Sequence, residues 1–205
     1  MDRRTLIVSV CALPVAASAP TWAAASANRE PVIGGPCEGC DWVYDDMPSK
    51  LASIARIAPK SEAGVPLVID GIVKDSHGAP SANVIVYAYH TNVAGIYPPA
   101  RNRHGTMKGW ALTDAQGRYR FDSMRPGAYP GRTVPEHVHM HVIEPRTGTY
   151  YIDELRFLDD PLVTAANRGT RERAGSGLVM PERRDGVWHA RRDIELGRNI
   201  PGYPG

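Results

Sequence analysis

The chain has 205 residues and a formal net charge of +2. Its 20 glycines and 18 prolines argue against a helix bundle, because both residues weaken helix interiors. Apolar residues make up 42% and charged residues 22%, which argues against a disordered chain. No apolar run is long enough for a membrane span, and no basic block interleaved with aromatic residues indicates nucleic-acid binding.

The N-terminus has the features of an export signal. Arg3 and Arg4 precede an apolar run at residues 6–19, and small residues at 23–25 suit signal peptidase. We therefore expect residues 1–25 to be a signal peptide and the mature protein to be periplasmic or extracellular. The arginine pair fits a twin-arginine signal, and an ordinary secretory signal is nearly as good an interpretation.

Residues 26–62 are expected to form an N-terminal arm that ends in a short helix. Apolar residues between Met47 and Ala58 share one helical face, with Asp46 as the N-cap and Pro59 as the stop. Cys37 and Cys40, the only cysteines of the expected mature chain, are predicted to form a disulfide, with a redox role as the alternative.

From Leu67 onward, the apolar period changes to two, which is typical of strands. Turn residues at 75–80 and 114–117 separate some of these segments. The pattern predicts an all-β fold, a β-sandwich spanning residues 63–205 with long loops, among them a surface loop at 165–186. The expected strands are 67–73, 83–90, 109–113, 118–121, 137–143, 150–157 and 187–196.

Histidines alternate with apolar residues at positions 135–142. His137 and His139 stand two positions apart, so on a strand they share a face, with Cα atoms about 6.6 Å apart. Val138 and Met140 then point into the core. The two imidazoles can therefore aim at one metal ion, although a solvated face with scattered histidines accounts for the spacing equally well.

Two histidines are too few for a metal site, and the cysteines lack the partner pair that a cysteine-type zinc site needs. Tyr97 and Tyr129 stand out among the nine tyrosines because each lies in a loop beside a predicted strand. A phenolate is a hard anionic oxygen donor. Two tyrosines together with His137 and His139 would therefore suit Fe(III).

These residues also carry a resemblance to a known family. Tyr97, Tyr129 and the Pro-x-His-x-His step at 135–139, in this order, are similar to the metal-binding residues of intradiol ring-cleavage dioxygenases. These ferric enzymes are related to protocatechuate 3,4-dioxygenase and catechol 1,2-dioxygenase. The resemblance runs from about Leu67 to Pro161 and is closer to the small exported members. It implies a β-sandwich of the prealbumin-like type, in agreement with the strand pattern.

The resemblance implies a role for each matching residue. Tyr97, Tyr129, His137 and His139 would be the ligands of Fe(3+), and Tyr129 would be the ligand that leaves when substrate binds. A catechol would chelate the iron and be cleaved by O2 between its hydroxylated carbons, which gives a muconate-type diacid. A small-molecule catechol and O2 are thus the expected partners. The sequence leaves open whether the protein forms a homodimer.

Two positions depart from the pattern of the family it resembles. The better-known enzymes have an arginine three residues before the first histidine ligand, where this chain has Val134. Arg132 is close in sequence and is predicted to substitute for it as a catalytic residue. Glu154 stands where those enzymes have a glutamine. His141, on the face of the paired histidines, is predicted to lie beside the site without binding the metal.

Three interpretations remain. The first is a ferric intradiol dioxygenase that acts outside the cytoplasm. The second is a non-catalytic exported β-sandwich that binds iron or a catechol ligand, which the missing arginine and glutamine favour. The third is a structural adhesion module without a metal, in which replacement of His139 would change only stability.

Overall fold

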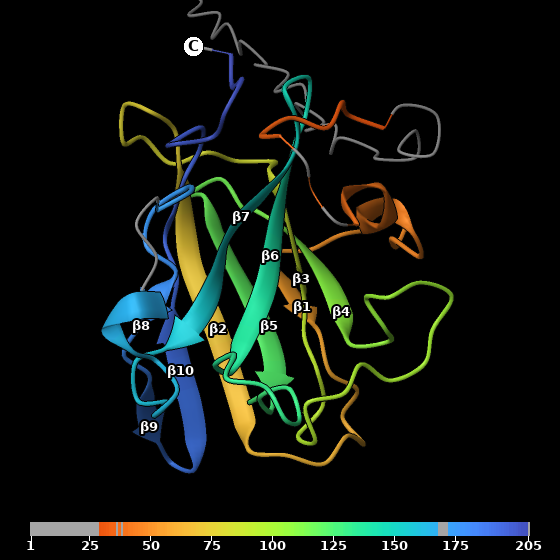
Figure 1. The fold of residues 1–205 in the computed structure, drawn as a ribbon. Coiled ribbons are helices and arrows are strands. Elements are labelled where there is room, and N and C mark those ends of the chain that lie inside the picture. Colours follow the sequence, from red (N-terminus) through yellow and green to blue (C-terminus); the bar gives the residue numbers. More distant parts are fainter. Residues whose placement is uncertain (1–28, 36, 38, 168–171, 205) are drawn as a thin grey trace, which may run out of the picture.

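The computed structural model describes residues 29–35, 37, 39–167 and 172–204. In this part of the chain, two β-sheets pack face to face (Figure 1), so the predicted all-β sandwich is confirmed. The predicted signal peptide, residues 1–25, lies outside the described residues. None of the helices in the described part is long and apolar enough to span a membrane.

One sheet has six strands and the other has five. The six-stranded sheet runs β1-β5-β2-β10-β9, and β11 pairs with β2 beyond β10. Its strands are β1 (Ile54–Arg56), β2 (Pro66–Lys74), β5 (Arg118–Met124), β9 (Glu182–Arg184), β10 (Val187–Arg191) and β11 (Ile194–Glu195). The five-stranded sheet runs β4-β3-β6-β7-β8. Its strands are β3 (Ile85–Tyr89), β4 (Lys108–Leu112), β6 (His137–Glu144), β7 (Gly148–Phe157) and β8 (Leu178–Val179).

All seven predicted strands therefore occur, with the last one divided into β10 and β11. The residues between β10 and β11 interrupt the pairing with β2, because the backbone N–H of Ile72 bonds instead to the Asp193 carboxylate at 3.0 Å. The surface loop expected at 165–186 is only partly a loop. It contains a short 3-10 helix, η2 (Ala165–Asn167), and the strands β8 and β9.

The main core lies between the two sheets. Alternate residues of β6, Val138, Met140 and Val142, are fully buried there against residues such as Ile69 of β2 and Phe121 of β5. Burying an aliphatic or aromatic side chain of this size contributes about 1.5–3 kcal/mol. The other face of β6, which carries the histidines, consequently points away from the main core.

A second apolar cluster covers that outer face of the five-stranded sheet. Tyr87 and Tyr89 of β3 and Trp110 of β4 pack there against Val43, which lies in a 3-10 helix, η1 (Cys40–Tyr44). Trp110 donates its indole N–H to the carbonyl oxygen of Val43 at 2.6 Å. The N-terminal arm thus lies over this sheet, with η1 as the orange turn beside β4 in Figure 1.

The helix predicted from Asp46 to Ala58 is wrong. Its place is taken by an extended segment that includes β1, which pairs with β5. The carbonyl oxygens of Ala52 and Ser53 accept backbone hydrogen bonds from Leu112 and Arg120 of the two different sheets. A short helix is marginal alone, and here strand partners satisfy the backbone. Asp46 has a left-handed φ of 65°, and its carboxylate pairs with Lys108 instead of capping a helix.

Candidate metal centre

Four side chains converge on the outer face of the five-stranded sheet. His137 and His139 project from β6, Tyr97 from the loop between β3 and β4, and Tyr129 from the loop between β5 and β6. The Nε2 atoms of the two histidines lie 3.1 Å apart, and each lies 3.2 Å from Tyr129 Oη. Tyr97 Oη lies 2.6 Å from Tyr129 Oη. Donors that share one metal ion at about 2.0–2.2 Å lie about 3 Å from one another, so these separations fit one coordination shell.

The hydrogen bonds behind the two rings fix which nitrogen is free. His137 Nδ1 lies 2.7 Å from the carbonyl oxygen of Pro135, which can only accept, so Nδ1 carries the proton. His139 Nδ1 lies 3.1 Å from the hydroxyl of Tyr151, which itself donates to Glu154. Both Nε2 atoms therefore present lone pairs to the same point. A bound cation removes the repulsion between them, so these residues fit a metal ion.

Burial determines the charge state of the donors. Desolvation, followed by the charge that His137 can carry, lowers the pKa of His139 to about 3, so its imidazole is neutral. Burial also raises the pKa of Tyr97 above its ordinary value, and the hydrogen bond with Tyr129 adds to the rise. Without a metal ion this phenol stays protonated. A strongly charged cation is needed to convert it into a phenolate donor.

A β-bulge places a carboxylate behind His139. The pairing of β6 with β7 shifts between Val138 and Met140, so Asp153 and Glu154 together oppose His139. The Oε1 atom of Glu154 accepts a hydrogen bond from Tyr151 at 2.7 Å, and Oε2 accepts one from Arg156 at 2.7 Å. Burial opposes ionisation of Glu154, but the nearby histidine charges and these hydrogen bonds lower its pKa to about 2.

Glu154 forms a metal-type cluster with His137 and His139, which raises the question of a two-histidine, one-carboxylate site. The geometry argues against that set. The closest approach of Glu154 to His139 is 3.4 Å, at Nδ1, on the side of the ring opposite to Nε2. The carboxylate therefore orients His139 through Tyr151. The family resemblance indicates that Glu154 lies near the site, but nothing in the sequence indicates Tyr151. The bulge that aligns Tyr151 and Glu154 behind His139 leaves no signal in the pattern of apolar residues.

A cavity of about 750 Å³ opens in front of the four donors. Its wall includes Tyr97, Tyr129 and His139, together with Arg132, the residue predicted to replace the missing arginine. The Cζ atom of Arg132 lies 5.9 Å from the ring centroid of Tyr129. Val134 is half-buried and is not among the residues that line this cavity.

The remaining candidate residues lie around the centre. His141 is fully buried, and its Nδ1 lies 3.7 and 3.9 Å from the sulfurs of Cys40 and Cys37, which form a disulfide. His104 lines the cavity and stacks on Tyr89, with ring centroids 3.8 Å apart.

Two other buried ring side chains lie away from the cavity. His90 lies in the interior, where its Nε2 bonds to the Ser123 hydroxyl at 2.6 Å. Trp110 belongs to the second apolar cluster rather than to the cavity wall.

Comparisons with known proteins give the relationships of the chain. A protein-family model described as dioxygenase matches residues 38–180. The protocatechuate 3,4-dioxygenase beta chain of Burkholderia cepacia is 32% identical over 130 residues, which cover 57% of this chain and 55% of that protein. Catechol 1,2-dioxygenase 1 of Acinetobacter lwoffii is 35% identical over 101 residues, which cover 47% and 31%. The chain thus spans about half, or less, of the length of these relatives.

Solved structures show the same fold. The dioxygenase domain of a carbohydrate-binding fusion protein from Streptomyces sp. SirexAA-E has a TM-score of 0.55 at 22% identity, covering 69% of this chain and 85% of that one. Catechol 1,2-dioxygenase from Pseudomonas arvilla C-1 has a TM-score of 0.59 at 20% identity, covering 85% and 65%. Because the family model spans more than half of the chain, this protein belongs to the intradiol ring-cleavage dioxygenase family.

Proposed function

We propose that this protein is a non-haem Fe(III)-dependent intradiol dioxygenase that cleaves a catechol-type ring with O2 to a muconate-type diacid. The observation that carries the proposal is the convergence of two phenol oxygens and two imidazole Nε2 atoms within 2.6–3.2 Å of their neighbours. Two anionic oxygen donors match a hard trivalent ion better than zinc. The names of the relatives, which act on catechol and protocatechuate, support the substrate class.

The residues of the chain have distinct roles in this proposal. Tyr97, Tyr129, His137 and His139 hold the iron, which when bound supplies a Lewis acid that activates the chelated catechol. The family resemblance assigns Tyr129 as the donor that would move aside when substrate binds, and its phenolate oxygen would then accept a catechol proton. Arg132, on the cavity wall, offsets negative charge on the bound catecholate.

Metal analysis and a visible spectrum test the proposal directly. Protein purified without added metal should contain stoichiometric iron, be red-brown from phenolate-to-iron charge transfer, and consume O2 when catechols are added. The Tyr97→Phe variant should lose colour and activity, whereas replacement of the exposed His77 by Ala should change neither. A colourless, iron-free wild-type protein would remove the proposal.

A second candidate is a protein that binds iron or a catechol ligand without turnover. The observation that favours it is the side chain at position 134, a half-buried valine in place of a cation, with Arg132 exposed on the loop. This candidate predicts that catechols shift the visible spectrum but that no O2 is consumed. The same titration, done with and without O2, separates the two functions.

We also propose that the protein is exported and that residues 1–25 are removed. The Cys37–Cys40 disulfide supports an oxidising compartment, since such bonds are rare in the cytosol. Mass determination of protein recovered from the periplasm or medium should give a mature start near residue 26. Retention of the full chain in the cytoplasm would refute this proposal.

A further inference from the structure

Arginines line the cavity that opens beside the donors. Arg103, Arg132 and Arg173 contribute to its wall, and no carboxylate does so among the described residues that line it. Arg132 comes from the loop between β5 and β6, and Arg173 from the segment that precedes β8. Cations from separate segments thus face one cavity, which attracts anions.

Two of these guanidinium groups are not paired with a carboxylate among the described residues. Elsewhere arginines pair with carboxylates, as Arg125 does with Glu136 and Asp159 at 2.7 Å. Neither Arg132 nor Arg173 has a carboxylate at ion-pair distance in the part of the chain that the structure describes, although the charge of Arg173 acts on the nearby Asp153 carboxylate. An arginine without a carboxylate partner at a cavity wall has its planar set of N–H donors available for a ligand.

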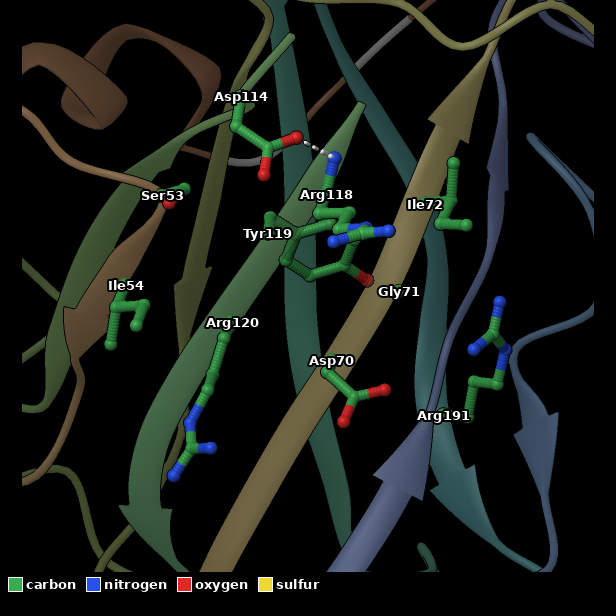
Figure 2. Close-up of a pocket in the computed structure, with 10 residues that line it drawn as sticks. All are labelled: Ser53, Ile54, Asp70, Gly71, Ile72, Asp114, Arg118, Tyr119, Arg120 and Arg191. Atoms are coloured by element: carbon green, nitrogen blue, oxygen red, sulfur yellow. Dashed lines mark hydrogen bonds between the residues drawn. The ribbon is translucent and has the colours of Figure 1, made fainter. Parts of the chain in front are cut away.

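The groove on the opposite sheet gives the contrast (Figure 2). It is also lined by arginines, but Asp70 and Asp114 lie in the same wall. Its Arg120 is held by Asp122 at 2.7 Å, and its Arg191 by Asp193 at 2.9 Å. That groove is therefore lined by charges of both signs, whereas the described residues that line the cavity beside the donors include arginines but no carboxylate.

Arg173 is held in position although it lies near the surface. Its carbonyl oxygen accepts the backbone N–H of Asp153 of β7 at 3.2 Å. The same oxygen accepts a hydrogen bond from the buried Arg192 at 3.3 Å. The backbone at Arg173 is thereby held by β7 and by the buried Arg192 side chain, which fixes the Cα position from which its guanidinium group extends.

The cavity is larger than a single aromatic ring requires. Its volume of about 750 Å³ lies within the range of pockets that enclose ligands of several rings or long substituents. Trp42 of the arm and Tyr97 add aromatic surface to the wall. A substituent that extends from a chelated catechol would therefore lie against a wall of aromatic side chains and arginines.

We propose that Arg132 and Arg173 form an anion subsite, which selects catechols whose ring carries an extended substituent ending in a carboxylate. This inference rests on the proposed function, because it assumes that the catechol is bound at the four donors. It adds two specificity-determining residues and a substrate class that combines size with negative charge. Single-ring neutral catechols are then poor substrates.

Four substrates separate the two properties. Catechol is small and neutral, protocatechuate is small and anionic, caffeate methyl ester is extended and neutral, and caffeate is extended and anionic. On the iron-loaded full chain, kcat/KM from O2 uptake should be highest for caffeate, about tenfold above its methyl ester. Raising the salt concentration should weaken the preference for the anion, because the charges are near the surface.

Variants assign the preference to the two arginines. Arg173→Ala should reduce the ratio of caffeate to its ester by about fivefold, mainly through KM, and leave the rate on the ester within about twofold. Arg132→Ala should also reduce this ratio, together with the rate on both substrates, because Arg132 has a proposed role at the bound catecholate. Arg120→Ala, the matched loss of one positive charge on the opposite sheet, should leave the ratio unchanged. The Arg173→Ala single variant keeps Arg132, so it isolates the subsite from the role proposed for Arg132 near the iron.

Binding measured by calorimetry on the iron-loaded protein in the absence of O2 provides a readout that does not depend on turnover. Caffeate should bind more tightly than its methyl ester, and Arg173→Ala should reduce this difference. If turnover occurs but catechol or the ester is preferred, or if the variants keep the wild-type ratio, the anion subsite is wrong and the dioxygenase function stands. If no substrate is cleaved while the anion preference persists in binding, the dioxygenase function fails instead.

Discussion

The two outer faces of the sandwich differ in what covers them. Over the five-stranded sheet, the arm and the loop that carries Tyr97 bury Tyr87, His104 and His141 to 2% exposure or less. Over the six-stranded sheet, described residues such as Arg118 and Arg120 stay in water beside the groove of Figure 2. The same strand alternation therefore produces neutral, dehydrated imidazoles on one face and paired charges on the other.

This difference explains why the candidate metal centre lies on the covered face of the described structure. Desolvation keeps the histidines neutral and able to donate lone pairs to a metal ion. On the open face the same residue types would be hydrated and mobile. The loops that cover the sheet, rather than the sheet itself, thus keep the histidines neutral and able to act as donors. Substitutions on the two faces should therefore differ in their effects on iron binding and stability.

The largest effect is expected when a donor on the covered face is removed. His139→Ala deletes one Nε2 lone pair and leaves the hydroxyl of Tyr151 without its partner at 3.1 Å. Iron affinity and O2 uptake with catechols should fall by roughly a hundredfold or more. Iron content by elemental analysis and the visible band measure this loss, and a coloured, active variant would contradict the assignment of His139 as a ligand.

Acid should act mainly through the buried imidazoles. Burial lowers the pKa of His90 and of His104 to about 4, whereas an unfolded histidine titrates near 6.5. The unfolded state then takes up protons first, so stability is complete above pH 6.5 and is lost as the pH falls toward 4. At pH 5 each histidine should cost about 2 kcal/mol, measurable by urea unfolding of the metal-free protein.

His104→Gln supplies the internal control for this acid effect. The variant should show a shallower loss of stability between pH 7 and pH 5, while His77→Ala, on an exposed turn, should follow the wild-type curve. Equal slopes for all three proteins would show that the buried imidazoles do not govern the acid response.

A smaller effect is expected from the residues behind His139. Tyr151→Phe removes the hydroxyl that joins His139 to Glu154, so the imidazole loses its orienting partner but keeps its Nε2 donor. Iron affinity should fall by about tenfold, and the charge-transfer band should shift. Competition with a chelator measures the affinity. Glu154→Gln, which can still accept from Tyr151, should retain more iron than Tyr151→Phe, and the reverse order would contradict the orienting role.

The sequence predicted much of this covered face, for a physical reason. Strand alternation is a local property, so the placement of His137 and His139 on one face followed from their spacing, and the loop tyrosines followed from the family resemblance. Two features escaped because they depend on contacts distant in sequence. The bulge that brings Glu154 behind His139 arises between β6 and β7. The extended segment around β1 exists because both sheets supply backbone partners that a local helical pattern does not encode.

The smallest effect is expected on the open face, where Arg120→Ala tests the other half of the comparison. Arg120 has about half of its side chain exposed, at 45%, and pairs with Asp122, which also contacts Arg56 at 3.5 Å. Because an exposed ion pair contributes little, unfolding free energy should change by less than about 1 kcal/mol, with iron content and catechol turnover unchanged. Urea unfolding and O2 uptake measure both quantities. A marked loss of activity would mean that the six-stranded sheet is coupled to the candidate metal centre. The arm and loop that cover the five-stranded sheet would then not account for the difference between the two faces.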